Sequence, residues 1–453
     1  MDRVRRVVVA GGGASGALLA ASLLRLARRP LRVTVIDPLP SLGRGRAYAA
    51  APPEHLLNVR AAGMSAFADD PGHFALWLSR RRPGLRAPDE AFAPRALYGE
   101  YLGEVVEGAR RAAAPGVELV HHRDAVVDAG VDGSGVRCAF ASGESLAADR
   151  LAVATGNAPS RPPFAPPPGA SWRWEDPLDA AAVDSLPADA PVAVVGTGLT
   201  LVDLLARLDA RGHRGVVQAV SRHGLLPRAH PDAPRHVDAA PWWVLPRTAR
   251  GLAGAVRRLA ELHPHEDGTR SVEALRGVTD ALWAELPLSE RGRFLRHLLP
   301  LWNVHRHRMP TESAGILARW RRDGRLHTLA GRAVEVVHGP SGAPYRLLVR
   351  PRGEERVVSF EAAMLFDATG PGDPLGTPLA RALLARGLAS PHPTGLGLDV
   401  EPSGLVRPAD AKPAGLLGAL GPVARGRSLE STAIREIRDR AARLAGTWTG
   451  QLC

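Results

Sequence analysis

Cysteine is almost absent from this chain of 453 residues, which contains only Cys138 and Cys453. The two cysteines lie far apart, and neither belongs to a Cys-x-x-Cys motif. A disulfide framework, a dithiol active site and a cysteine-rich zinc site are therefore excluded as the basis of function. Cys138 stands in the strand-like run 135–140, where a small buried hydrophobic side chain is expected.

Lysine is nearly absent as well, since Lys412 is the only lysine among 58 basic residues. The arginines are scattered in pairs and triplets, such as 80–82, and they form no long basic block. We therefore interpret the formal net charge of +12 as a bias of composition, and we expect no nucleic-acid partner.

No segment has the composition of a membrane span or a secretory signal. The best candidate, residues 7–24, carries no charge and follows three arginines, but it contains Gly11, Gly12, Gly13 and Gly16. Glycines at this density indicate a turn between a strand and a helix rather than one apolar helix. We expect no membrane partner and a cytoplasmic location.

The chain does contain an ordinary globular composition and an internal repeat. Hydrophobic residues make up 45% and charged residues 23%, and the length suggests about two to three domains. Residues 5–36 and 191–222 each predict a strand, a glycine turn, a helix and a second strand. Each half later reaches an apolar strand that ends in Ala-Thr-Gly, at 154–156 and 368–370. The pattern predicts an α/β protein with two Rossmann-like dinucleotide-binding domains.

The order of the segments predicts that the second domain is inserted in the first. The first domain would take residues 1–160 and return with residues 373–453, which supply one more strand and a final helix. Residues 161–190 read as a Pro-rich linker, and residues 191–372 as the second domain. A helical stretch at about 248–296 is expected as an insertion into the second domain.

The first glycine motif is Gly11-x-Gly13-x-x-Gly16. Gly11 permits the tight turn, Gly13 lets a pyrophosphate approach the backbone, and Gly16 lets the helix pack closely on the strand. Asp37 ends the second strand 21 residues after Gly16, where its carboxylate can accept hydrogen bonds from a ribose hydroxyl. Together these features predict dinucleotide binding; the alternative is a purely structural turn.

The second motif, Gly196-x-Gly198, has Leu201 at the position of the third glycine. In place of the acid of the first unit, the second unit has Ser221-Arg222. A guanidinium and a hydroxyl suit a 2′-phosphate, which favours NADPH over NADH; the alternative is an ordinary surface arginine. Two dinucleotide sites indicate electron transfer between them, with FAD on the first domain and NADPH on the second.

The motifs of the chain also resemble those of a known family, in the same order and over nearly its whole length. These motifs are Gly45-x-Ala-Tyr48, His55-Leu-Leu-Asn-Val59, Met64-Ser-Ala-Phe67, Asp69-Asp-Pro-x-His-Phe74, Tyr98-Gly-x-Tyr101, Ala154-Thr-Gly-Asn157, Gly196-Thr-Gly-Leu-Thr200 with Asp203, Ser221-Arg-x-Gly-Leu-Leu-Pro227, His305-Arg-His-Arg308, Gly421-Pro422 and Glu430-Ser-Thr-Ala-Ile434. The chain is similar to the FAD/NAD(P)-binding family that includes FAD-dependent urate hydroxylases and aspartate N-monooxygenases. It is similar more distantly to N-hydroxylating and class B flavin monooxygenases, but it lacks the Phe-x-Gly-x-x-x-His-x-x-x-Trp signature of Baeyer–Villiger enzymes.

The resemblance implies roles for individual residues. The loop 55–65 would run beside the isoalloxazine ring, with Asn58 and Ser65 at the ring edge or ribityl chain and Met64 on the ring face. Val126 would lie in the strand that contacts the adenine. For each of these residues, packing of a loop or strand on the core is the alternative.

Further roles concern the pyrophosphate and the end of the chain. Thr155-Gly156 would close the pyrophosphate pocket, and Gly421-Pro422 would approach the flavin. The last helix would point its N-terminus at the pyrimidine end of the ring, with Ser431 or Thr432 as N-cap. The expected cofactor-binding residues are Gly11, Gly13, Ser15, Gly16, Asp37, Asn58, Met64, Ser65, Val126, Thr155, Gly156, Gly196, Gly198, Leu199, Thr200, Ser221, Arg222, Gly421, Pro422 and Thr432.

The run 305–308 is the densest polar cluster of the sequence. His305, Arg306 and Arg308 are candidates for binding an anionic substrate or the NADPH phosphates; the alternative is a solvated basic helix end before Pro310. We expect no metal site there, because no carboxylate is near in sequence and no His-x-x-x-His pattern occurs. No catalytic side chain can be assigned from the sequence.

The resemblance implies an FAD-dependent, NAD(P)H-using oxidoreductase, and a monooxygenase in particular. NADPH would reduce FAD, and a C4a-hydroperoxyflavin formed with molecular oxygen would hydroxylate a small nitrogen-containing substrate, such as an amino acid, amine or purine. Two alternatives stay open. One is a flavin reductase or dehydrogenase that passes electrons to a quinone or a protein, and the other is a non-catalytic FAD/NAD(P)-binding redox sensor.

Overall fold

The computed structural model describes residues 3–49, 51–133, 135–232, 241–262, 269–340, 342–409 and 415–451. Its first sheet is built around the apolar strand at the start of the chain. The order of its five parallel strands is β14 (Leu417–Ala419), β7 (Arg150–Val153), β1 (Arg5–Ala10), β2 (Leu31–Ile36) and β3 (Val117–His122). The two strands predicted within residues 5–36 are confirmed, at 5–10 and 31–36. Because strand β14 comes from the end of the chain, this sheet is completed only after the whole second unit.

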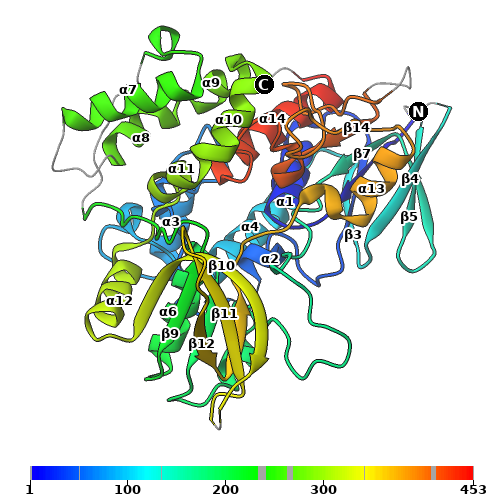
Figure 1. The fold of residues 1–453 in the computed structure, drawn as a ribbon. Coiled ribbons are helices and arrows are strands. Elements are labelled where there is room, and N and C mark those ends of the chain that lie inside the picture. Colours follow the sequence, from blue (N-terminus) through cyan, green and yellow to red (C-terminus); the bar gives the residue numbers. More distant parts are fainter. Residues whose placement is uncertain are drawn as a thin grey trace.

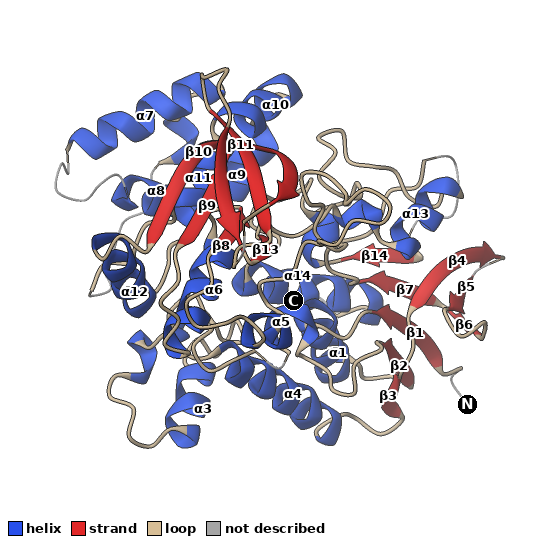
Figure 2. Ribbon diagram, turned by 60° about the horizontal axis from the view of Figure 1, so that its bottom comes forward, coloured by secondary structure: helices blue, strands red, loops and turns tan. Residues whose placement is uncertain are grey.

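Both faces of the first sheet are covered, which explains why its strands are apolar throughout. One face carries the helices α1 (Ala14–Leu26), α4 (Arg95–Arg111) and α14 (Ile434–Thr449). The other face carries the antiparallel strands β4 (Val126–Asp132), β5 (Gly135–Phe140) and β6 (Ser145–Ala148), together with helix α13 (Pro378–Ala385). Figure 2 shows the helices and the small sheet on opposite sides of β1.

Cys138 lies in β5 and has no solvent exposure. Burial raises the pKa of its thiol to about 12, so the thiolate is not formed near neutral pH. The expectation of an inert, buried cysteine is confirmed, whereas Cys453 lies outside the described residues.

The second sheet repeats the plan of the first. Its strands lie in the order β12 (Val358–Ala362), β11 (Tyr345–Pro351), β10 (Leu326–His338), β9 (Val217–Ser221), β8 (Val192–Val195) and β13 (Met364–Asp367). The first part of β10 pairs with β9 in parallel, and its second part pairs with β11 in antiparallel fashion. The helices α5 (Ala180–Asp184), α6 (Leu199–Ala210) and α12 (Thr311–Arg322) belong to this unit, and side chains of all three enter the core on one face of the sheet.

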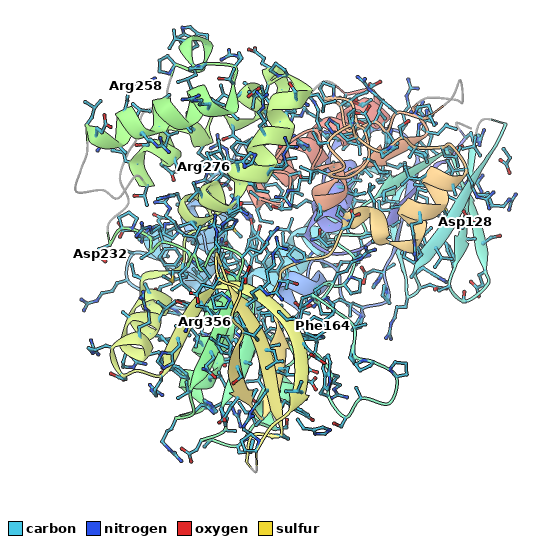
Figure 3. All side chains as sticks on the ribbon, viewed as in Figure 1. Asp128, Phe164, Asp232, Arg258, Arg276 and Arg356 are labelled. Atoms are coloured by element: carbon cyan, nitrogen blue, oxygen red, sulfur yellow. The ribbon has the colours of Figure 1, made fainter. Side chains whose placement is uncertain are left out.

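The Pro-rich linker lies against the second sheet rather than apart from it. Phe164, Trp172 and Trp174 pack on its other face, and the backbone of Glu175 bonds to Leu365 and Asp367 beside β13. Figure 3 shows Phe164 beside the strands of this sheet. The linker therefore fixes the start of the second unit by aromatic packing.

Five helices form a separate unit on the second domain, at the upper left of Figure 1. They are α7 (Ala249–Glu261), α8 (Thr269–Arg276), α9 (Thr279–Glu285), α10 (Leu288–His297) and α11 (Leu299–Arg306). We call them the helical unit. It continues to Arg306, ten residues beyond the expected helical stretch at about 248–296.

The remaining elements are short. They are the helices α2 (Gly45–Tyr48) and α3 (His73–Arg81) and the single 3-10 turns Ala61–Gly63, Pro88–Glu90, Trp242–Val244, Pro374–Gly376 and Gly421–Ala424. Within the described part of the chain, no helix has both the length and the apolar character needed to cross a membrane.

Candidate functional site: two nucleotide cradles and the junction between them

The first glycine turn has a geometry that only glycine permits. Gly11 has a φ of +105°, and a Cβ there would lie 2.4 Å from the carbonyl oxygen of Ala154. A Cβ on Gly16 would lie 1.8 Å from the carbonyl oxygen of Gly11. Gly13 is the N-cap of α1, and no side chain caps this helix. The N-terminus of α1 is therefore bare and closely approached by backbone, which is the arrangement that binds a phosphate.

Asp37 lies at the end of β2 and shapes this turn. Its two carboxylate oxygens accept hydrogen bonds from the backbone amides of Gly12, at 2.6 Å, and Leu39, at 2.8 Å. A carboxylate has about four acceptor positions, so two bonds leave room for a ribose hydroxyl. Asp37 thus holds the loop and can still accept the hydrogen bond predicted for it.

The C-terminal part of the chain completes the first cradle. Leu420 donates its amide to Val153 across 3.1 Å, and a Cβ on Gly421 would lie 2.4 Å from the hydroxyl oxygen of Ser15. The predicted residues Ser15 and Gly421 are therefore brought together at the first turn of α1. Thr155 lies next to Ala154, with its hydroxyl 3.5 Å from that of Thr377. Gly156 follows with a φ of +72° and open space where its Cβ would be.

A second loop, which contains Gly43 and Gly45, approaches the same turn. No role was predicted for this loop from the sequence. The amide of Gly43 donates to the carbonyl of Gly12 at 2.8 Å, and a Cβ on Gly45 would lie 2.9 Å from the Cα of Gly13. The signal for this contact was present in the sequence as the pair Gly43-x-Gly45 shortly after Asp37.

The loop 55–65 is held by contacts to its own unit and to residue 230 of the second unit. Ser65 is fully buried, and its hydroxyl donates to the carbonyl of Asp70 at 2.6 Å. Met64 is buried in the core that also holds α1, and the carbonyl of Asn58 lies 2.9 Å from His230 Nε2. Val126 is buried at the start of β4, in the same core as Ala10 at the end of β1. Ser65 therefore stabilises its loop, and the side chain of Asn58 is the more available polar group.

The second glycine turn reproduces the first. Gly196 has a φ of +114°, and a Cβ there would lie 1.9 Å from the carbonyl oxygen of Ala368, the counterpart of Ala154. Gly198 is the exposed N-cap of α6, with no atom within 4 Å of its Cβ position. Leu199 and Thr200 form the first turn of α6. The internal repeat predicted from the two Ala-Thr-Gly segments is confirmed, and this turn also leaves space for a phosphate.

Two arginines from different elements lie beside His223, which follows the end of β9. Arg222 is exposed, so its guanidinium group is accessible to the phosphate of a ligand. Arg352, from the turn between β11 and β12, lies 3.1 Å from His223 Nδ1. Burial, Arg352 and Arg222 together lower the pKa of His223, so this ring is neutral at pH 7. Ser221 is used within the loop, because its hydroxyl bonds to Thr197 at 2.7 Å and accepts from Gly224 at 3.0 Å.

Arg352 was missed because nothing in the sequence links position 352 to position 222. The contact depends on the strand β10, which places the turn after β11 beside the end of β9. Only the sheet topology brings the two guanidinium groups to one edge.

The run 305–308 lies where the helical unit meets both nucleotide units, and its arginines are buried. Arg306 forms an ion pair with Glu430, and Arg308 forms one with Glu273. Both arginines are only 9% exposed, so the alternative of a solvated basic helix end is wrong. His305 lies on the same helix turn but lines the cavity of the helical unit. The sequence could not show the ion pairs, because Glu430 is 124 residues away.

These arginines belong to a larger cationic cluster. It consists of Arg276, Arg306, Arg308 and Arg425, and Figure 3 labels Arg276 at this junction. Burial and then Arg306, Arg425 and Arg276 lower the pKa of His307 to about 3. Burial and then Arg308 lower the pKa of His230 to about 4. Both imidazoles are therefore neutral at pH 7.

The start of α14 differs from the prediction. The helix begins at Ile434 with Ala433 as its N-cap, so neither Ser431 nor Thr432 caps it. Thr432 is exposed, whereas Ser431 is fully buried and its hydroxyl has no hydrogen-bond partner among the described residues. A buried polar atom without a partner is costly, so Ser431 marks a place where a bound group can supply the missing bond.

The described residues therefore fit two dinucleotides. The glycine turns leave room at two helix N-termini, and Ser431, shortly before α14, has a buried hydroxyl without a partner among the described residues. No group of three or more potential metal ligands gathers within the described ranges.

Comparison with known proteins supports this reading of the fold. Residues 8–158 match a family model described as FAD-NAD(P)-binding. A search of curated protein sequences finds no significant match.

Among solved structures, the reduced ornithine hydroxylase from Pseudomonas aeruginosa has a TM-score of 0.66 at 16% identity, over 99% of both chains. An ornithine N-hydroxylase from Kutzneria sp. 744, with reduced FAD, NADP+ and L-ornithine, has a TM-score of 0.64 at 16% identity, over 98% of both chains. The L-lysine 6-monooxygenase from Pseudomonas syringae has a TM-score of 0.64 at 17% identity, over 98% of both chains. At these identities the likeness shows the fold, and the predicted α/β fold with two Rossmann-like units is confirmed.

Proposed function

We propose that this protein is an FAD-dependent, NADPH-using monooxygenase that hydroxylates a nitrogen atom of a small substrate. The observation that carries the proposal is the pair of matching glycine turns, each with a bare helix N-terminus beside an Ala-Thr-Gly strand end. The likeness to ornithine and lysine hydroxylases over nearly the full length supports the N-hydroxylation. The motif resemblance to urate hydroxylases and aspartate N-monooxygenases keeps purines and amino acids among the substrate classes to test.

Each cradle has a defined task in this proposal. Gly11, Gly13 and the N-terminus of α1 hold the pyrophosphate of FAD, and Asp37 accepts a hydrogen bond from its ribose. Gly198 and the N-terminus of α6 hold the pyrophosphate of NADPH. Bound FAD and NADPH would supply the redox chemistry, which is hydride transfer and activation of molecular oxygen. The task of the protein in this proposal is to orient both cofactors.

Turnover measurements on the purified protein test the reaction class. We expect the protein to retain FAD and to consume NADPH and oxygen in proportion to an added amine, with label from 18O2 entering a hydroxylamine product. Rapid NADPH oxidation with a quinone, without oxygen in any product, would instead identify a flavin reductase. Flavin binding without NADPH oxidation by any acceptor would identify a redox sensor.

The coenzyme preference tests the second cradle. Arg222→Ala or Arg352→Ala removes one charge-assisted hydrogen bond to the 2′-phosphate, so we expect KM for NADPH to rise about tenfold and KM for NADH to stay the same. Arg356→Ala is a matched control, because Arg356 is an exposed arginine of the same turn that pairs with Glu354. An unchanged NADPH preference in both test variants would show that the 2′-phosphate binds elsewhere.

A further inference from the structure

The helical unit lines a largely apolar cavity that is partly open to solvent. Its volume is about 580 Å³, which lies within the range of about 300–1,000 Å³ typical of small-molecule sites. All five helices α7 to α11 contribute to the wall. Three aromatic rings line it, with Phe294 packed edge-to-face against both Trp283 and Trp302. The remaining wall is mostly leucine, valine and alanine, so the cavity suits a ligand with an apolar body that can lie against aromatic faces.

The described inner wall of this cavity carries no carboxylate and no guanidinium group, and its one titratable side chain is that of His305. Among the described residues that line it, the charged ones are Arg257 and Glu261, and both are exposed at the rim. The hydroxyl of Thr279 is used within its helix, where it donates to the carbonyl of Leu275 at 2.8 Å. The lining residues that the structure describes therefore offer no buried carboxylate for an ammonium group and no buried guanidinium for a carboxylate group.

The surroundings of the cavity disfavour a cation further. Arg306 follows the lining residue His305, and Arg276 follows the lining residue Leu275. Both arginines belong to the cationic cluster at the junction. An ammonium group there would lose its hydration, and the nearby carboxylates of Glu430 and Glu273 already pair with Arg306 and Arg308, whereas a neutral amine needs no counter-ion.

The inner end of the cavity borders the flavin side of the proposed site. Leu429 forms part of the wall, and it is followed by Glu430 and by Ser431 with its unpaired hydroxyl. The indole nitrogen of Trp283 donates to the carbonyl of Gly426 at 2.9 Å. The cavity wall is thus attached to the segment that runs from Gly421, at the first turn of α1, to the start of α14.

We propose that this cavity binds the apolar body of the substrate, and that the substrate is an amine which is uncharged at neutral pH, such as an arylamine, rather than an amino acid. The proposal rests on the proposed function and specifies its substrate class. The reaction balances as amine, oxygen, NADPH and one proton giving hydroxylamine, NADP+ and water. One oxygen atom enters the new N–O bond, and the other leaves as water with the electrons of the hydride.

Two amines of similar size, one neutral and one cationic at the assay pH, test the substrate class. We suggest 4-butylaniline, which is neutral at pH 7.5, and 4-phenylbutylamine, which is a cation. Calorimetric titration of the flavin-loaded protein should show that the aniline binds about tenfold more tightly or better, with the negative heat-capacity change of apolar burial. Equal affinity, or tighter binding of the cation, would overturn the proposal.

A variant that fills the cavity tests the location. Ala253 lines the cavity from α7, so Ala253→Phe should reduce the affinity for 4-butylaniline at least about tenfold by occupying its space. Arg258→Phe introduces the same residue on the same helix outside the lining, and Figure 3 shows Arg258 at the outer edge of α7. This control should bind the aniline like the parent protein. Aniline binding that Ala253→Phe leaves unchanged would overturn the assignment of the cavity.

The outcomes separate this inference from the proposed function. Aniline binding that Ala253→Phe removes, without oxygen-dependent NADPH consumption by any amine, would overturn the monooxygenase and keep the cavity as an arylamine site. Stimulation of NADPH consumption by ornithine or lysine, without aniline binding, would overturn the cavity assignment and keep the monooxygenase.

Discussion

Breaking the ion pair between Arg306 and Glu430 should lower the free energy of unfolding strongly. The side chains of Arg306 and Glu430 are 8% and 3% exposed, and the cationic cluster surrounds them. Glu430→Gln keeps the volume but leaves Arg306 buried without its counter-ion. Breaking such a pair typically costs about 3–5 kcal/mol.

Glu436 should reduce this cost. It is half-buried in the first turn of α14, and its pKa is raised by burial first and then by the charge of Glu430. Glu430→Gln removes this repulsion, so the pKa of Glu436 falls and its carboxylate can compensate part of the charge of Arg306. We therefore expect Glu430→Gln to lower the free energy of unfolding by about 3 kcal/mol, at the lower end of that range.

Urea unfolding of the flavin-free and flavin-loaded protein measures this loss. The double variant Arg306→Met/Glu430→Gln removes both charges, so it should be more stable than Glu430→Gln alone by about 2 kcal/mol. A loss below about 1 kcal/mol for Glu430→Gln, or strictly additive effects in the double variant, would refute the reasoning. In that case Arg306 would be available for a substrate anion, as the sequence first suggested.

Two further predictions concern the first cradle and the buried histidines. Gly16→Ala should abolish FAD retention and destabilise the protein by about 1–3 kcal/mol, the usual cost of overpacking. The added Cβ of Gly198→Ala meets no atom, so this variant should retain FAD and the stability of the parent protein. Flavin absorbance and unfolding curves measure both effects. In the folded protein His230 and His307 have pKa values lowered to about 4 and about 3, whereas a histidine of the unfolded chain has a pKa of about 6.5. Below pH 6.5 the unfolded chain therefore binds more protons than the folded protein. Stability should be complete above pH 6.5 and fall by about 1.4 kcal/mol per pH unit for each imidazole between pH 6.5 and 5. A flat profile of urea midpoints over this range, or an equal slope in the His230→Asn/His307→Asn variant, would contradict it.

The local elements were predictable because their signals are local. The strand, glycine turn and helix at 5–26 follow from adjacent residues, and even the contact between Gly11 and Ala154 could be inferred from the repeated Ala-Thr-Gly segments. Residues brought together by topology were not predictable. Arg352 reaches His223 through the register of β10, and Glu430 reaches Arg306 across the junction of three units.

The start of α14 shows a different limit. Ser431 and Thr432 are residue types that favour N-caps, and propensity therefore placed the helix start there. Instead the segment 428–433 turns twice before the helix, with Ser431 donating its amide to Ser428 and Ala433 donating to Glu430. Tertiary packing against the helical unit decides where this helix begins.

The return of the chain to the first sheet has a consequence for synthesis on the ribosome. Strand β7 pairs with β1 on one side and with β14 on the other, and residues 154–416 are made between β7 and β14. At a translation rate of about 5–20 residues per second, the edge of β7 and the apolar face of α1 remain uncovered for tens of seconds. During this interval the nascent chain presents an unpaired edge that other chains can join. Production of this protein should therefore depend on translation speed and on chaperones that cover the first unit until its last strand arrives.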